Sequence, residues 1–138
     1  MSIKFSQHIT GQAKSGFSLV ELMIAVAVVA ILVTLSYPSY VNFVLRANRS
    51  DAQMTLQDWA NQQMAWRADH PAYNTGINPS NTDKYTYSMV STTTSFTLTA
   101  TAIGRQVADE QDGVSCATVT LRQDGTTGPD GHQLCWGK

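Results

Sequence analysis

The stretch of residues 17–35 constrains this chain most, because all but one of its residues are apolar or small hydroxyl side chains. At about 1.5 Å per residue, it makes a helix of roughly 28 Å, close to the hydrocarbon thickness of a bilayer. Lys4 and Lys14 precede the stretch, which places the N-terminus on the cytoplasmic side. Tyr37 and Tyr40 follow it, where aromatic rings favour the far membrane interface. The sequence therefore predicts a single membrane-spanning segment over residues 17–40.

The segment before this stretch differs from an ordinary secretory signal. Residues 1–16 carry no apolar run of their own, and no small-residue cleavage site follows Leu35. A cut after the apolar stretch is therefore not indicated. We expect the stretch to be retained in the mature protein, with residues 41–138 forming an exported part.

The exception inside the apolar stretch is Glu21. A carboxylate there costs on the order of 2.5–3.5 kcal/mol on insertion scales, and such residues usually face a partner. In one interpretation, Glu21 lies one turn inside the membrane and reaches back to the headgroups. In the other, a cut just before Phe17 creates an α-amino group on a second subunit that pairs with Glu21.

The run "GFSLVELMIA" resembles the N-terminal signal of type IV pilins: a short basic leader ending in Gly16, Phe17 as the first mature residue, and Glu21 as the fifth. The resemblance implies that residues 1–16 are removed by a prepilin peptidase and that the new amine of Phe17 is methylated. It also implies that Glu21 pairs with the N-terminus of a neighbouring subunit and so sets its register. Pro38 stands where many pilins have a proline that loosens the helix on assembly, although a simple kink at the membrane surface explains it equally well.

Residues 41–70 predict the amphipathic second half of the helix, which ends at His70 because Pro71 follows. The side predicted to pack on a sheet carries Leu45, Ala52, Leu56, Trp59, Ala60, Gln63 and Trp66. The two tryptophans are interpreted as core residues instead of a ligand platform. A solvated or intersubunit face is expected to carry Arg46, Arg49, Asp51, Met54 and Asp58.

Alternating apolar and polar residues predict four strands, over residues 85–91, 95–104, 116–125 and 132–138. In the clearest of them, Phe96, Leu98, Ala100 and Ala102 point inward. Tight connections between the strands favour an antiparallel meander. The predicted fold is thus α+β, with a long N-terminal helix whose second half packs on a four-stranded antiparallel sheet.

The only two cysteines, Cys116 and Cys135, predict one disulfide in an exported chain, with two free thiols as the alternative. This disulfide contributes about 3 kcal/mol in the chain-entropy model and is expected to tie the last strand to its neighbour. The surrounding "CATVTLRQDGTTGPDGHQLCW" resembles minor pilins of the type IVa system. Ala117 stands where that pattern often has glycine, and the loop of residues 108–115 is longer than usual.

Other kinds of site are set aside. Asp109, Glu110 and Asp112 beside Gly113 are interpreted as a solvated acidic turn, because the distal glutamate of a calcium loop is missing. The histidines are dispersed and no catalytic motif is present, so we expect no enzyme activity, no metal and no cofactor. DNA binding is kept as an alternative, although no basic run unites the cations beyond Trp66, which are Arg67, Lys84, Arg105, Arg122 and Lys138.

The resemblance implies a minor pilin that helps to initiate or prime assembly of a type IV pilus, the organelle of twitching motility, adhesion and DNA uptake. Its expected partners are the prepilin peptidase, other major and minor pilins, the inner-membrane assembly machinery and the membrane itself. The chain would sit in the inner membrane of a Gram-negative bacterium with its C-terminal part in the periplasm, and later in the extracellular pilus. A major pilin and a DNA-binding competence pilin are the alternatives, and a secretion-system pseudopilin fits the cysteine pair less well.

Overall fold

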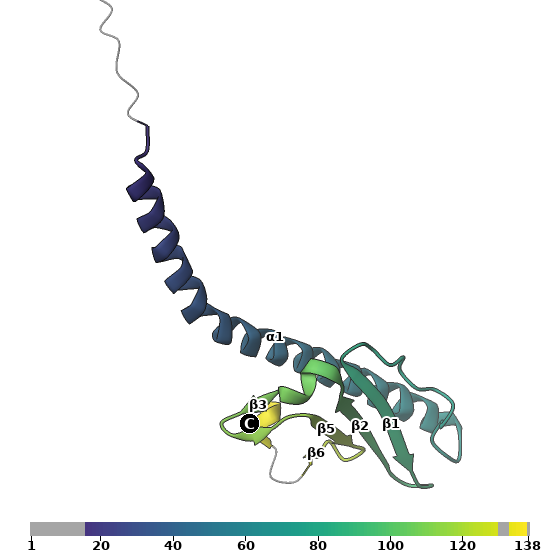
Figure 1. Cartoon of the computed structure of the whole chain (residues 1–138). Coiled ribbons are helices and arrows are strands. Elements are labelled where there is room, and N and C mark those ends of the chain that lie inside the picture. Colours follow the sequence, from purple (N-terminus) through teal and green to yellow (C-terminus); the bar gives the residue numbers. More distant parts are fainter. Residues whose placement is uncertain (1–15, 130–132, 138) are drawn as a thin grey trace, which may run out of the picture. The chain divides into compact units, whose positions relative to one another are not determined.

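The computed structural model describes residues 16–129 and 133–137 (Figure 1). The chain divides into two compact units, Met1–Tyr37 and Pro38–Lys138. One long helix, α1 (Leu19–Asp69), contributes to both. Apart from Gly16, the predicted leader lies outside the described residues, as do His132 and Lys138.

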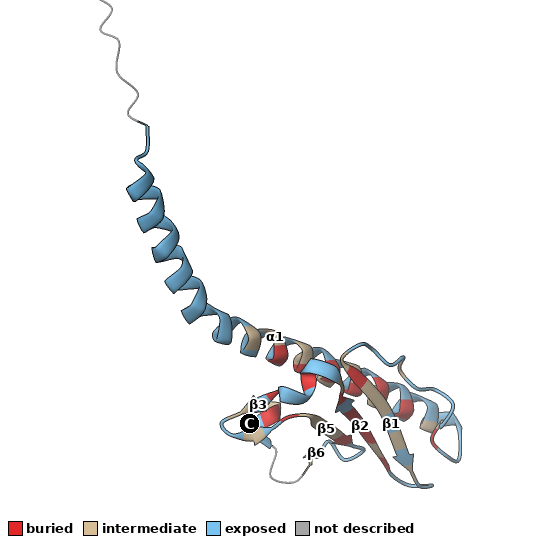
Figure 2. Ribbon diagram, in the orientation of Figure 1, coloured by how far each residue is buried: buried red, intermediate tan, exposed pale blue. Residues whose placement is uncertain are grey.

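The first part of α1 carries an apolar surface that the chain itself does not cover. Every described side chain from Gly16 to Tyr40 is exposed, and Figure 2 shows this part of the helix in pale blue throughout. By length and composition, α1 is the one helix among the described residues that is able to cross a membrane. Exposed apolar side chains all round a helix are the pattern expected of a segment that packs in lipid or against other helices.

Pro38 lies within α1 and does not end it. Proline has no backbone N–H, so the carbonyl of Thr34 lacks its usual helical partner. In the turn before it, the hydroxyls of Thr34 and Ser36 donate to the carbonyls of Ile31 and Leu32 at 2.7 and 2.8 Å. The helix therefore continues through the predicted break at Pro38. That the helix loosens there on assembly stays a prediction.

The second part of α1 has a stripe of buried residues, where the ribbon is red in Figure 2. Its members recur every three or four residues and are Leu45, Arg49, Ala52, Leu56, Trp59 and Gln63. The prediction for Trp59 is confirmed, since it is 1% exposed, but that for Trp66 is wrong. Trp66 is 36% exposed and stacks on His70, just beyond the end of α1, with ring centroids 3.7 Å apart, so it packs against the chain that leaves the helix and not against the sheet.

The sheet contains β1 (Tyr85–Ser91), β2 (Phe96–Ala102), β5 (Thr118–Arg122) and β6 (Thr127–Gly128). Their order is β1-β2-β5-β6 and every pairing is antiparallel. All four side chains predicted to point inward from β2 are buried. They meet Val119 and Leu121 of β5 in one core with three residues of the helix, which are Ala52, Leu56 and Trp59. The predicted fold class is confirmed.

The fourth strand is the exception, because the prediction of a strand over residues 132–138 is wrong. The chain pairs with β5 earlier, through β6, and Pro129 then supplies no N–H to extend the ladder. Gln133–Trp136 form a short 3-10 helix, η2. Trp136 Nε1 donates to the carbonyl of Gly128 at 3.3 Å, which holds η2 beside β6.

The segment between β2 and β5 forms a substructure whose geometry the sequence left open. It begins with a 3-10 helix, η1 (Gly104–Ala108), and continues into a hairpin of β3 (Glu110–Gln111) and β4 (Val114–Ser115). Asp112 and Gly113 make the turn with φ of 51° and 78°. Positive φ at both positions is typical of the Asp-Gly turn that joins two antiparallel strands.

Candidate functional site

The residues at the predicted cleavage point precede α1 and are open to the surroundings. Phe17 is 83% exposed. A Cβ added to Gly16 would meet nothing within 4 Å, so the described chain itself does not require glycine at this position. Any requirement for glycine must therefore come from an outside molecule that approaches the backbone closely.

Glu21 occupies the first turn of α1, at the positive end of the helix dipole. Its backbone N–H donates to Ser18 Oγ at 3.2 Å, which makes Ser18 the N-cap and Glu21 the third helical residue. This Ser-x-x-Glu spacing is the signature of a capping box, a signal in the sequence that the predictions above did not use. Glu21 is exposed and forms no ion pair within the described residues.

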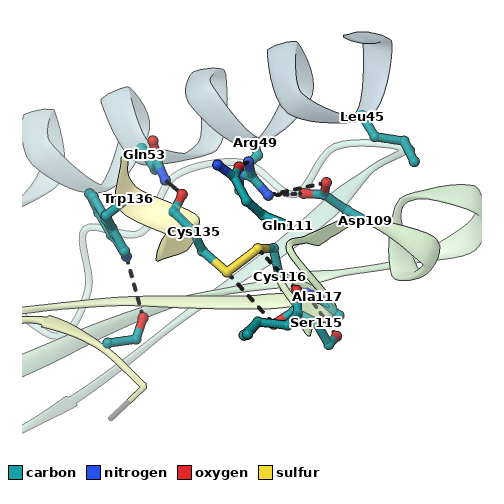
Figure 3. Close-up of a disulfide and its surroundings, with 12 residues drawn as sticks. Leu45, Arg49, Gln53, Asp109, Gln111, Ser115, Cys116, Ala117, Cys135 and Trp136 are labelled. Carbon is teal, nitrogen blue, oxygen red and sulfur yellow. Dashed lines mark hydrogen bonds and ion pairs between the residues drawn. A yellow bond between two sulfur atoms is a disulfide. The ribbon is translucent and has the colours of Figure 1, made fainter. Parts of the chain in front are cut away.

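A buried polar cluster joins the second part of α1 to the segment between β2 and β5 (Figure 3). Arg49 Nη1 lies 3.2 and 3.1 Å from the two carboxylate oxygens of Asp109, and Arg49 Nη2 donates to Gln111 Oε1 at 2.6 Å. Both predictions for this pair are wrong: Arg49 does not lie on a solvated face, and Asp109 does not belong to a solvated acidic turn. Glu110 and Asp112 are exposed, as predicted.

The helix periodicity already contained the signal for Arg49. It lies four residues after Leu45 and three before Ala52, so it falls on the buried stripe. A buried guanidinium needs a carboxylate nearby. No comparable signal singled out Asp109 among the three acids of its loop.

Amide side chains extend the cluster around η1. Gln106 Nε2 donates to the carbonyl of Leu45 at 2.9 Å, and Asn48 Nδ2 donates to Gln106 Oε1 at 3.0 Å. Burial raises the pKa of Asp109, an effect that the neighbouring Arg49 opposes. Burial also raises the pKa of Tyr85 to about 12, and the charge of Asp109 adds to this effect. Burial therefore opposes the ionisation of both groups, and the charge of Arg49 favours the ionised form of Asp109.

The disulfide predicted between Cys116 and Cys135 is confirmed (Figure 3), with Cα atoms 5.6 Å apart. Both residues are buried. The disulfide ties η2 to the chain just before β5, and not a last strand to its neighbour as predicted. Gln53 Nε2 donates to the carbonyl of Cys135 at 2.8 Å, so α1 also holds η2.

The cations considered for DNA lie on separate elements of the described chain. Arg67 donates to the carbonyl of His70 and lies over the ring of Tyr73, while Lys84 pairs with Asp83 at 3.0 Å. Lys84 adjoins the start of η1, because its carbonyl accepts from the N–H of Ile103. Among the described residues, no group of three His, Cys, Asp or Glu side chains is placed to hold a metal ion.

Comparison with known proteins decides the family. A family model described as "Type IV minor pilin ComP, DNA uptake sequence receptor" matches residues 38–120, and one for the "Prokaryotic N-terminal methylation motif" matches residues 11–37. The chain belongs to the type IV pilin family. The methylation motif contains the predicted cleavage point and Glu21 of this pilin.

Relatives of the pilin cover most of its length. It is 30% identical over 124 residues to "Fimbrial protein EcpC" of Eikenella corrodens, which covers 83% of this chain and 80% of that protein. It is also 30% identical over 118 residues to "Type IV major pilin protein PilE" of Neisseria gonorrhoeae, covering 82% and 71%. A solved type IV pilin from Shewanella oneidensis matches the fold with a TM-score of 0.55 and 25% identity, over 63% of this chain and 93% of that one.

Proposed function

We propose that this pilin is a minor subunit of a type IV pilus that helps to initiate or prime its assembly. The observation that supports this most is the match of residues 38–120 to a family described as a minor pilin. The PilE relative is described as a major pilin, so the alternative of a major subunit has support as well. The two differ in abundance along the filament.

The proposed pathway begins in the inner membrane, with the C-terminal part in the periplasm. A prepilin peptidase cuts between Gly16 and Phe17 and the new amine of Phe17 is methylated. The open backbone at Gly16 supports this step, because a protease needs to approach it closely. The assembly machinery then brings the subunit among other pilins, and Pro38 lets the helix loosen as it packs.

Glu21 sets the register of the entering subunit in this proposal. Within the described chain its carboxylate has no cationic partner, and the α-amino group of a neighbouring subunit would supply one. A buried ion pair of this kind contributes register more reliably than stability. In the free subunit, where that partner is missing, the positive end of the helix dipole stabilises the Glu21 carboxylate, and Ser18 Oγ accepts from the Glu21 N–H.

The stoichiometry of sheared filaments tests the proposed minor role. We expect this chain at a small fraction of the principal subunit, and filament number to fall sharply when its gene is deleted. A chain that forms most of the filament mass would instead be a major pilin.

A second candidate, a receptor for DNA during uptake, is supported by the description of the same family model. Duplex DNA binding to the unit Pro38–Lys138 should weaken as salt is raised, with a slope of about −0.9 for each phosphate contacted. Lys84, which adjoins η1, is the probe, and replacing it by alanine should reduce the slope by about 0.9 if it contacts a phosphate. Binding that does not respond to salt would remove this candidate.

A further inference from the structure

A groove opens between α1 and the loop that follows it, with a volume of about 180 Å³. Ile77 and Pro79 give it an accessible apolar wall above the buried Trp59, and its polar lining comes from Thr55, Asp58 and Gln62. We call this the Asp58 groove. It lies entirely within the unit Pro38–Lys138.

Hydrogen bonds hold the loop wall of the Asp58 groove against the helix. Gln63 uses both ends of its amide, donating to the carbonyl of Asn74 at 2.8 Å and accepting from its N–H at 2.9 Å. Trp59 Nε1 donates to the carbonyl of Ile77 at 2.6 Å. The groove is therefore formed before any occupant arrives, which lowers the entropic cost of binding.

The lining chemistry selects a long side chain with an apolar stem and a cationic end. The stem would cover the Ile77 and Pro79 surfaces, and the cation would meet the Asp58 carboxylate. Asp58 is exposed and accepts a hydrogen bond from Gln62 at 2.8 Å, but it forms no ion pair in the described part of the chain. An arginine fits these requirements best, because its planar guanidinium pairs with a carboxylate through two bonds.

The same chain presents such a side chain elsewhere. Arg105 is exposed on η1 and forms no ion pair within residues 16–129 and 133–137, and Val107 beside it is 53% exposed. Gln106, between them, anchors η1 to α1 at the level of Leu45 and Asn48. The charge and the apolar surface of η1 therefore complement the Asp58 groove.

One copy cannot join these two features. Asp58 lies roughly three turns further along α1 than the point where η1 is anchored, about 15–20 Å along the helix axis. A second, parallel copy displaced by that amount along the axis brings its Arg105 level with the groove of the first. Since each contact repeats the same displacement, the interface is heterologous and cannot close into a ring, as a filament requires.

We propose that Arg105 of one copy occupies the Asp58 groove of the next copy along the filament. The proposal rests on the role of this pilin as a filament subunit. It implies that copies of the chain lie next to one another in the pilus, in runs, even where the chain is a minor component.

Reversing the charges in the full-length chain tests the contact in assembled pili. D58R alone and R105D alone should each reduce incorporation about tenfold or more, because like charges then face each other. The double variant D58R/R105D should restore incorporation. The matched control is D69R, which makes the same charge change at the exposed end of the same helix and should leave incorporation unchanged.

A cross-link identifies the occupant. In cells that express one tagged copy with D58C and a second with R105C, oxidised pili should contain a dimer of the two copies. The proposal would be overturned if each single variant loses incorporation, the double variant does not restore it, and no such dimer forms. That result would show that another pilin occupies the groove. Incorporation of every variant at the wild-type level would overturn it as well. If the unmodified chain itself is missing from pili, the proposed function is refuted instead.

Discussion

Arg49 Nη1 lies 3.1 Å from Asp109 Oδ2, in a place where solvent reaches only 6% of the first side chain and 1% of the second. This contact connects the middle of α1 to the hairpin segment between β2 and β5. Since the desolvation of two buried charges offsets much of their attraction, the pair specifies where that segment docks more than it stabilises the fold.

Removing one partner of this pair should be far more costly than removing both. In R49M, Asp109 stays buried without its cation, and the free energy of unfolding should fall by about 3–5 kcal/mol. The double variant R49M/D109L should recover most of that loss. Urea denaturation of the unit Pro38–Lys138 measures both, with the exposed substitution R105M as a control expected to change stability by less than about 0.5 kcal/mol.

The loss in R49M should also depend on pH. Burial raises the pKa of Asp109 and Arg49 lowers it, so removing Arg49 raises it further. A carboxyl group whose pKa is raised in the folded state stabilises that state while the group is protonated. This stabilisation is complete below the unfolded-state pKa of 3.8 and is lost as the pH rises through the folded-state pKa. R49M should therefore lose less stability at pH 4 than at pH 7, and an equal loss at both would contradict the buried pair.

Tyr85 should make the fold sensitive to alkali. Its pKa is raised from 10.0 to about 12, so its contribution is complete below pH 10 and is lost as the pH rises from 10 to about 12. The expected loss is about 1.4 kcal/mol per pH unit in that window. Its buried hydroxyl has no hydrogen-bond partner in the described structure, so Y85F should keep or slightly raise stability at pH 7 and remove most of the alkaline slope. A Y85F variant with an unchanged slope would show that another group is responsible.

When the disulfide is broken, the C-terminal end of the chain should loosen earlier than the helix does. C116S/C135S should lose about 3 kcal/mol in the chain-entropy model. Hydrogen exchange should increase first in η2 and β6, while β1 and β2 stay protected by their own pairing. Protease resistance that is the same with and without reductant would count against this role.

Glu21 should affect assembly without affecting insertion. Replacing it by alanine should leave membrane insertion and leader cleavage intact while reducing incorporation into filaments, because the entering subunit loses its charge partner. E21Q separates the two roles, since glutamine retains capping at the third helical position but carries no charge. If the E21Q chain enters pili at the wild-type level, the registration mechanism is wrong.

Periodicity predicted those parts of the fold where one face meets the core. The inward residues of β2 and the position of Trp59 follow from spacing alone, because burial selects one side of a strand or helix. The disulfide followed from the presence of only two cysteines. By contrast, the sequence does not show that Asp109 is the acid that approaches Arg49, because this depends on the path of a long loop.

The last strand shows a second limit. Residues 132–138 contain apolar residues at strand-like spacing, but the disulfide holds Cys135 beside Cys116, and Gln53 of α1 donates to its carbonyl, so Cys135 belongs to η2 and not to a strand. The Asp58 groove was equally inaccessible to sequence reasoning, because its two walls are joined by backbone carbonyls that every residue possesses.

The mass of the polypeptide recovered from sheared pili tests the central claim most directly. A subunit processed after Gly16 should be found in the pilus fraction beginning at Phe17, with one methyl group on its amine. A chain that still carries residues 1–16, or that begins well beyond Phe17, would contradict the account.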